Sequence, residues 1–297
     1  MTTAHTPVLL HVTGILPGDS GEAPFVQVDA STPLLHARDL GVVRGEGAFE
    51  TIGVFDGQIR ALDGHLKRLA RSARMLDMPA PDLLALEQAV LAAVDLHDDV
   101  PDLMVRVFMT AGSEKGLPGA GVPVAWVIAQ EAIGYASAID GLRVLTLDRG
   151  ISVRAPQDAP WLLAGAKSLS YAINMAATRE AVRRGADDAL FVSSEGYLLE
   201  GPTSTLLVKR GERFSTTPAD AGVLPGTSLD SVFAHLRAGG TVCDEVLMTR
   251  DDVLGSDGAW LLSSVRCAAP ITHLDGHELP VDRDLTQRLA NAVSGRG

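Results

Sequence analysis

The sequence has few cysteines, and this shortage excludes two classes of protein. Cys243 and Cys267 are the only cysteines among 297 residues. Two cysteines cannot build a disulfide framework, and their spacing lacks the Cys-x-x-Cys pairs of a structural zinc site. We therefore expect both to be small, buried apolar residues.

Long apolar stretches and an excess of positive charge are also missing. No apolar stretch approaches the roughly 20 residues that span a bilayer. A secretory signal requires positive charge near its start, but the first Lys or Arg of this sequence is Arg38. The 37 acidic residues outnumber the 25 basic ones, and the formal net charge is −12. This charge disfavours nucleic acids and anionic membranes as partners. We expect a soluble, cytoplasmic protein.

The remaining composition is that of a folded globular chain. Hydrophobic residues make up 46% and charged residues 21% of the sequence, which excludes a disordered or fibrous protein. Because 297 residues are many for one hydrophobic core, we expect two domains. The segment 132–141 has no clear period, so we predict a small N-terminal domain at residues 1–134 and a larger C-terminal domain at residues 135–297.

Hydrophobic periodicity predicts the elements of each half. Leu62, Leu66 and Leu69 recur at helical spacing, in a helix that Asp63 can cap and Pro79 ends. The rest of the first half predicts strands at 25–29, 48–55, 58–62, 103–109 and 122–129 and a helix at 82–97. The second half predicts strands at 142–147, 189–193, 197–199, 205–209 and 260–263 and helices at 170–184 and 227–236. Strands followed by helices in each half indicate α+β domains.

Lysine is scarce, and one lysine differs from the others. Lys67, Lys115 and Lys209 lie on a polar helix face, in a loop and at a hairpin tip, where solvation explains them. Lys167 follows the apolar segment 159–166 and precedes a helix whose apolar face includes Ile173. Apolar surroundings lower the pKa of an ammonium and make the neutral amine available as a nucleophile and base. Taken alone, the feature also fits a surface lysine at a helix end.

Several familiar motifs do not fit the sequence. Gly45-Glu46-Gly47 lacks the third glycine of a dinucleotide-binding loop, because Glu50 stands there. Ala166 replaces the glycine that a phosphate-binding loop needs before its lysine. The eight histidines show no metal-binding spacing, and we expect no metal site.

Five short motifs follow one another along the chain. They are Arg44-Gly-Glu-Gly-Ala-Phe-Glu50, His65-Leu-Lys-Arg68-Leu, Lys167-Ser-Leu-Ser, Glu200-Gly-Pro-Thr-Ser204 and Leu224-Pro-Gly-Thr227. In this order they resemble the class IV aminotransferase family, the fold-type-IV group of pyridoxal-phosphate enzymes. The resemblance runs from about residue 39 to about residue 276 and implies the two-domain α+β fold of D-amino-acid and branched-chain aminotransferases.

The resemblance assigns cofactor roles to these motifs. It makes Lys167 the Schiff-base lysine, a role that needs a nucleophilic amine able to shuttle a proton. It places Glu200 at the pyridine nitrogen of pyridoxal 5'-phosphate and Arg68 at the phosphate, where a fixed guanidinium suits a dianion. Further cofactor contacts are implied for Thr203, Ser204, Gly226, Thr227, Ser263 and Ser264.

The segment at Gly226 and Thr227 is predicted to open a helix. Its amides and macrodipole favour a bound anion. Asp230, one turn into the helix, also fits a capping box with Thr227.

Three arginines are candidates for binding the substrate carboxylate: Arg44, Arg106 and Arg266. Arg106 stands in Met104-Val105-Arg106, where the branched-chain enzymes carry Tyr-x-Arg. Arg266 follows Ser263 and Ser264, and is either a substrate contact or a surface charge. The loop at residues 110–113 lacks the Arg and His with which D-amino-acid aminotransferases hold the carboxylate.

The motifs together look most like the actinobacterial aminodeoxychorismate lyases. This likeness implies a folate-biosynthesis enzyme that converts 4-amino-4-deoxychorismate into 4-aminobenzoate and pyruvate, since loss of pyruvate makes the ring aromatic. A D-amino-acid or branched-chain aminotransferase on the same cofactor is the alternative, and a catalytically silent cofactor-binding module is a third reading. The resemblance also implies a small-molecule amine substrate and a homodimer.

Overall fold

The computed structural model describes residues 5–18, 23–133 and 136–296, and the chain forms two compact units. Unit 1 comprises residues 1–133 and 166–171, and unit 2 comprises residues 134–165 and 172–297. The predicted boundary at residue 135 lies outside the described residues. The segment 166–171 was assigned by sequence to the C-terminal domain. It groups with unit 1 because its main chain is hydrogen-bonded to a strand there.

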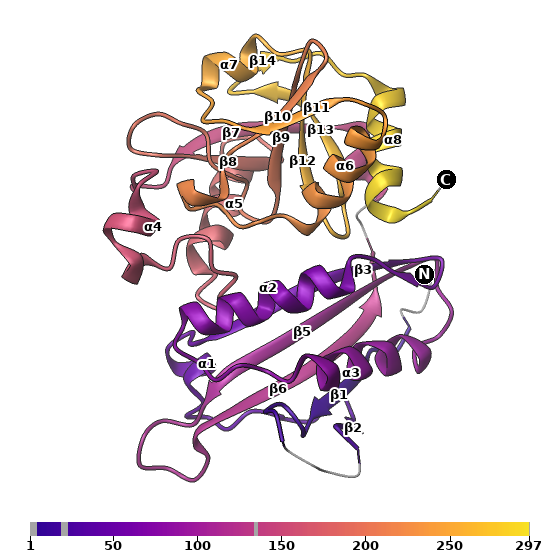
Figure 1. The fold of residues 1–297 in the computed structure, drawn as a ribbon, viewed down its shortest axis with the longest axis vertical. Helices are drawn as coiled ribbons and strands as arrows, with labels where there is room; N and C mark the ends of the chain where they lie inside the picture. Colours follow the sequence, from indigo (N-terminus) through magenta and orange to yellow (C-terminus); the bar gives the residue numbers. More distant parts are fainter. Residues whose placement is uncertain (1–4, 19–22, 134–135, 297) are drawn as a thin grey trace. The chain divides into compact units, whose positions relative to one another are not determined.

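Unit 1 is an antiparallel sheet with helices α2 and α3 on one face (Figure 1). Its elements are β1 (Val8–Val12), β2 (Phe25–Val28), α1 (Leu40–Val43), β3 (Gly47–Phe55), β4 (Gln58–Ile59), α2 (Leu62–Met75), α3 (Leu83–Asp95), β5 (Asp102–Gly112) and β6 (Ala120–Glu131). The strand order is β2-β1-β6-β5-β3-β4. The core lies between the sheet and the two helices, where Leu66, Leu69 and Ala73 of α2 are buried.

Strand β3 alternates between the two faces of this sheet. Ala48, Ile52 and Val54 are buried in the core. Glu50 has the same parity, and it is completely buried as well. The core face of β3 therefore carries one acidic residue among apolar ones.

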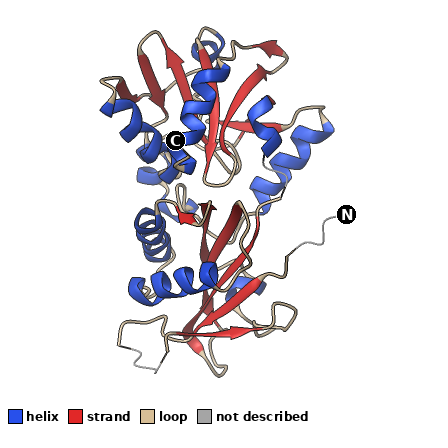
Figure 2. Cartoon of the chain, turned by 90° about the vertical axis from the view of Figure 1, so that its right-hand side faces the viewer, coloured by secondary structure: helices blue, strands red, loops and turns tan. Residues whose placement is uncertain are grey.

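Unit 2 contains a mixed eight-stranded sheet with helices around it, and Figure 2 shows each unit with its own sheet. Its elements are η1 (Ala136–Asp140), β7 (Leu142–Asp148), α4 (Ala155–Asp158), η2 (Pro160–Leu162), α5 (Ala172–Arg183), β8 (Asp188–Val192), β9 (Thr205–Arg210), β10 (Arg213–Thr216), η3 (Ala219–Ala221), α6 (Thr227–Ala238), β11 (Val242–Glu245), α7 (Arg250–Leu254), β12 (Gly258–Ser263), β13 (Cys267–Leu274), β14 (His277–Glu278) and α8 (Arg283–Ser294). The order is β11-β10-β9-β12-β13-β7-β8, and β14 pairs with β13. The α+β class predicted from the sequence is confirmed.

Helix α6 begins at Thr227 as predicted, but two predicted helix caps were wrong. Helix α2 begins at Leu62 after Ala61, which has a left-handed φ of 49° and no side-chain cap, so Asp63 lies inside the helix. Helix α6 has Gly226 as its N-cap without a side-chain hydrogen bond. The predicted capping box of Thr227 with Asp230 is therefore wrong, because Thr227 is already helical.

Other predictions failed where tertiary contacts override local pattern. In the segment 197–199, Tyr197 and Leu198 make isolated bridges rather than a strand, and α5 starts at Ala172 rather than at residue 170. Ile173, predicted for the inner face of this helix, is 67% exposed. Cys267 is buried as expected, but Cys243 is half-buried. Among the described residues, no helix is both long enough and apolar enough to cross a membrane.

Candidate active site

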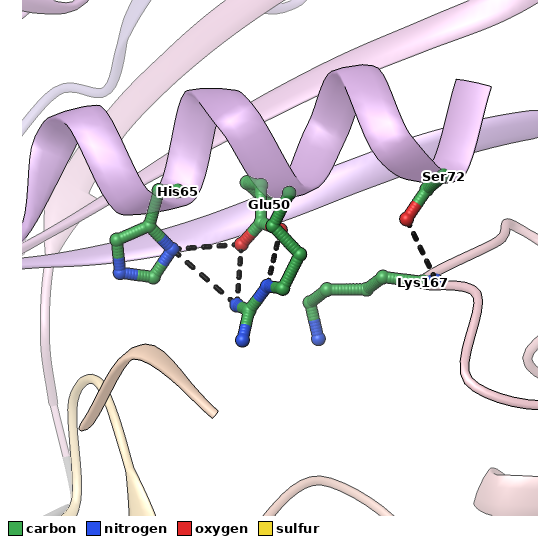
Figure 3. Close-up of polar contacts among 5 residues, drawn as sticks. Glu50, His65, Ser72 and Lys167 are labelled. Carbon is green, nitrogen blue, oxygen red and sulfur yellow. Dashed lines mark hydrogen bonds and ion pairs between the residues drawn. The ribbon is translucent and has the colours of Figure 1, made fainter. Parts of the chain in front are cut away.

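Lys167 lies at a junction between strand β3 and helix α2 in unit 1. Its carbonyl accepts the N–H of Phe49 at 3.1 Å, and the N–H of Leu169 donates to the Gly47 carbonyl at 2.8 Å. Its own N–H donates to the Ser72 hydroxyl at 3.1 Å (Figure 3). The carbonyl of Lys167 is thus bonded to β3 and its N–H to α2.

The amine of Lys167 lies against two aromatic rings. Its Nζ is 4.5 Å from the ring centre of Phe49 and 5.7 Å from that of Tyr171. The two rings meet edge to face, with centres 5.2 Å apart. Aromatic faces attract cations, so these rings stabilise the protonated amine. Lys167 is half-buried, as the sequence predicted.

A buried ionic cluster joins helix α2 to strand β3. Arg68 donates from Nε to Glu50 Oε1 and from Nη2 to Glu50 Oε2, both at 2.7 Å. His65 Nδ1 lies 2.7 Å from the same Oε2 (Figure 3). An ionised carboxylate accepts hydrogen bonds and donates none, so His65 is the donor. The bidentate geometry fixes the plane of the guanidinium.

The charges of this cluster follow from burial and pairing. Burial would raise the pKa of Glu50, but the Arg68 guanidinium and the His65 hydrogen bond outweigh it and lower the pKa to about 2. Burial lowers the pKa of His65, although the hydrogen bond to Glu50 opposes this, and the charges of Arg68 and Lys167 lower it further. At neutral pH the cluster is therefore an ion pair with a neutral histidine.

No functional role was predicted from sequence for Glu50, His65 or Ser72. A signal was available for Glu50, because it alternates with Ala48 and Ile52 on an otherwise apolar strand face. For Ser72 the helical spacing was informative, since a residue four positions after Arg68 lies on the same helix face.

The two candidate substrate arginines of unit 1 differ in their surroundings. Arg106, on β5, donates from Nη2 to Gln130 and lies over the Phe108 ring at 5.7 Å. Its Nε is buried and has no hydrogen-bond partner among the described residues. Arg44 follows α1, is exposed, and donates to the Val43 carbonyl.

Glu200 precedes the Gly-Pro-Thr-Ser turn of unit 2. Its Oε2 accepts the Leu224 N–H at 3.1 Å, and its Oε1 lies 3.6 Å from Nη1 of Arg149, an ion pair too long for a hydrogen bond. The Arg149 guanidinium is stacked 5.0 Å over Phe191. The Glu200 side chain, 13% exposed, is therefore fixed beside positive charge.

Three turns gather at one end of the unit 2 sheet. Because Thr205 pairs with Leu262, the residues before β9 and after β12 lie together, which places Ser204 near Ser263 and Ser264. An added Cβ at Gly226 would lie 2.5 Å from the Thr205 hydroxyl, so the start of α6 lies at the same end. The residues in these turns include the predicted cofactor contacts Thr203, which is exposed, and Thr227, which is buried.

Some polar atoms at this end have no hydrogen-bond partner among the described residues. The Ser204 hydroxyl is buried and lacks one. Arg266 donates from Nη1 to Asp188 at 2.8 Å, while its Nε and Nη2 are buried without partners. Its side chain is 15% exposed, so the interpretation of Arg266 as a surface charge is wrong. Buried donors without partners are costly, and such atoms are typical of ligand sites.

Comparisons with known proteins agree with the family that the motifs indicate. A bifunctional aminodeoxychorismate lyase / D-amino acid transaminase of Mycobacterium tuberculosis is 42% identical over 258 residues, which are 84% of this chain and 88% of that protein. The fold IV-transaminase CpuTA1 from Curtobacterium pusillum has a TM-score of 0.92 and 44% identity, over 98% of this chain and 100% of its own.

A hypothetical aminotransferase from Mycobacterium tuberculosis, solved in a PLP-bound form, has a TM-score of 0.87 and 35% identity over 98% of this chain and 100% of its own. The family model for amino-transferase class IV matches residues 47–274. This match spans well over half of the sequence. The chain therefore belongs to the class IV aminotransferase family, has the fold-type-IV fold predicted from its motifs, and is an enzyme of the lyase or transaminase type.

Proposed function

We propose that the protein is a pyridoxal-phosphate-dependent 4-amino-4-deoxychorismate lyase, with Lys167 as the lysine that binds the cofactor. The observation that carries the proposal is the setting of Lys167, whose main chain is fixed by hydrogen bonds to Phe49 and Ser72. Helix α2, which carries Ser72, also carries Arg68 as a buried, oriented cation. The 42% identity to a relative named as a lyase and D-amino acid transaminase supports it.

The residues present fit such a cofactor. Arg68 is 9% exposed, and its guanidinium, whose plane Glu50 fixes, carries a positive charge suited to phosphate. At Gly201 an added Cβ would lie 2.4 Å from the Ser204 hydroxyl, and at Gly226 it would meet Thr205, so these glycines let the backbone approach a ligand closely. The Ser204 hydroxyl, which has no partner among the described residues, is a donor for that ligand.

When bound, pyridoxal phosphate supplies an aldehyde for an amine and a ring that withdraws electrons from the reacting carbon. Lys167 Nζ takes the proton from the amine-bearing carbon of the substrate and holds it beside Phe49 and Tyr171. Glu200, whose carboxylate lies 3.6 Å from the Arg149 guanidinium, would hold a proton at the ring nitrogen. Contacts to the cofactor are proposed for Arg68 in unit 1 and, in unit 2, for Thr203, Ser204, Gly226, Thr227, Ser263 and Ser264.

The substrate carboxylates are assigned to arginines. Arg106 and Arg266 each carry at least one buried N–H that lacks a partner among the described residues. Arg44, the first residue of the first motif, is exposed. We propose Arg106 and Arg266 as the stronger carboxylate contacts and Arg44 as a weaker one, because buried charges bind anions more tightly than solvated ones.

One assay separates the lyase from its alternative. The lyase is expected to release pyruvate from 4-amino-4-deoxychorismate without accumulating the pyridoxamine form of the cofactor. Accumulation of that form with D-alanine, D-glutamate or leucine, and no pyruvate release, would replace the lyase with a transaminase. Both activities together would match the name of the Mycobacterium tuberculosis relative.

A variant tests the lysine itself. Lys167→Ala is expected to lower turnover at least about 1,000-fold and to abolish covalent attachment of the cofactor after borohydride reduction, measured by mass spectrometry. Lys115→Ala is the control, because that lysine lies in a loop and should behave like the parent. Attachment that persists in Lys167→Ala would reject the assignment.

We also propose a cytoplasmic homodimer, on the analogy with the family. Light scattering of the purified protein measures the oligomer, and a monomer at working concentration would refute that part of the proposal.

A further inference from the structure

Ser72 contacts the residue on which the proposed chemistry depends. Its hydroxyl accepts the main-chain N–H of Lys167 at 3.1 Å across 95 positions of sequence (Figure 3). Ser72 has no exposed surface, and it lies one helical turn beyond Arg68. We propose that Ser72 is a positioning residue, which fixes Lys167 relative to the phosphate-binding Arg68. This inference rests on the proposed role of Lys167.

The environment of Ser72 explains why a hydroxyl is needed there. Its neighbours Leu69 and Ala73 are fully buried apolar residues of the same helix, and a buried hydroxyl without a hydrogen bond is unfavourable. Alanine would fill nearly the same space without that cost. The benefit of serine therefore comes from its partner, the Lys167 N–H.

The main chain of Lys167 leaves the sheet at this contact. In an antiparallel pair the two facing residues exchange both of their N–H and carbonyl groups. Lys167 accepts the Phe49 N–H, but its own N–H turns to Ser72 on helix α2. The hydrogen bond to Ser72 thus takes the place of a strand hydrogen bond, and it fixes the orientation of the peptide group that precedes the Cα of Lys167.

Helix α2 carries both the proposed phosphate-binding residue, Arg68, and the residue that fixes Lys167, Ser72. Arg68 and Ser72 are four residues apart, on one face of α2, so the cation and the anchor of the lysine move together. A displacement of about 1 Å at a reacting group can cost 100-fold in rate. A long, flexible lysine side chain reaches its target reproducibly when its main chain is fixed.

Amide exchange in the cofactor-free protein tests the contact directly. In Ser72→Ala, the Lys167 N–H loses its acceptor and should exchange with deuterium about tenfold faster, as measured by NMR or by mass spectrometry of a peptide covering residues 165–171. Ser72→Thr retains the hydroxyl and should restore slow exchange. If Ser72→Ala does not fold, Ser72→Cys keeps the volume with a weak acceptor and should show the faster exchange.

Attachment of the cofactor tests the consequence. Covalent trapping of pyridoxal phosphate at Lys167 should be about tenfold slower in Ser72→Ala, while the affinity for inorganic phosphate at Arg68 stays within about twofold. Ser256→Ala is the control, since the Ser256 hydroxyl of unit 2 is buried without a hydrogen-bond partner among the described residues, and it should leave the trapping rate unchanged. If Ser72 were purely structural, Ser72→Ala would lower stability without changing the trapping rate.

The outcomes separate this inference from the proposed function. Unchanged exchange and unchanged trapping in a folded Ser72→Ala protein would overturn the positioning role. If the parent protein traps no cofactor at Lys167, the proposed function fails, while the exchange experiment still decides whether Ser72 fixes the lysine.

Discussion

The Glu50–His65–Arg68 cluster of unit 1 and the polar groups at the proposed cofactor end of unit 2 are built on different principles. In unit 1, Glu50, His65 and Arg68 form a closed cluster that is paired internally. At the proposed cofactor end of unit 2, the Ser204 hydroxyl and two nitrogens of Arg266 are buried without partners among the described residues. The first cluster keeps its geometry without a ligand. The second gains free energy when a ligand supplies the missing partners, so a ligand bound at this end should stabilise unit 2.

The largest expected effect comes from breaking the closed cluster. Arg68→Met leaves the Glu50 charge buried without its main partner, and should lower the free energy of unfolding by about 3–5 kcal/mol. Hydrogen exchange of peptides from each unit during guanidinium unfolding measures where the loss falls. It should fall in unit 1, and Arg68→Met combined with Glu50→Leu should recover much of it.

Arg266→Met is the matched change in unit 2. It should cost less, because it also removes two buried N–H groups that lack partners among the described residues. An equal or larger loss for Arg266→Met would contradict the distinction between a closed cluster and an open one.

Acid should weaken unit 1 through Glu50. Its pKa falls from 4.5 to about 2 on folding, so its stabilisation is complete above about pH 4.5 and is lost as the pH falls toward 2. The shift corresponds to about 3 kcal/mol. The lowered pKa of His65 acts in the same direction below about pH 6.5. Glu50→Gln should flatten the dependence of unfolding on pH, measured by denaturant midpoints between pH 3 and 7.

Glu195 provides the control for this prediction. Hydrogen bonds from Ser152 and Ser193 lower its pKa to about 2 as well, but it lies on the surface of unit 2. Water screens such a group, and Glu195→Gln should change the pH profile less than Glu50→Gln. If the surface variant has the larger effect, burial is not what makes the unit 1 cluster important.

A smaller effect is expected from closing the glycine-lined end of unit 2. Gly226→Ala places a Cβ against the Thr205 hydroxyl, and should weaken cofactor binding about tenfold, a cost near 1.4 kcal/mol. Fluorescence titration with pyridoxal phosphate measures the affinity. Gly239→Ala, at the other end of the same helix, has an ordinary 3.4 Å contact and should bind like the parent.

The smallest expected effects concern the substrate. Arg106→Leu should raise KM roughly fivefold with kcat nearly unchanged, since it removes binding common to ground and transition states. Arg266→Leu tests whether unit 2 supplies a second carboxylate contact, and Arg44→Ala should change KM less than twofold because Arg44 is exposed. Steady-state kinetics with 4-amino-4-deoxychorismate rank the three. A larger effect of Arg44→Ala would reassign the contact.

The features that could be predicted from sequence are local ones. The spacing of Leu62, Leu66 and Leu69 predicts a helix that the structure confirms as α2, and the motif order identifies the family. The start of α6 at Thr227 is also confirmed. The predicted caps at Asp63 and Thr227 were wrong, because a cap depends on the backbone conformation of the capping residue as well as on side-chain type.

Residue order alone determined that Lys167 stands apart from three solvated lysines, and in which family the chain belongs, since motifs of a few residues are readable without folding. Tertiary structure alone decided that Glu50 meets His65 and Arg68 across 15 and 18 positions, and that Ser72 meets Lys167 across 95. Helical and strand periods report which face a side chain occupies, but not which distant segment packs against that face. The partners of a buried charge or amide are therefore set by packing of the whole unit.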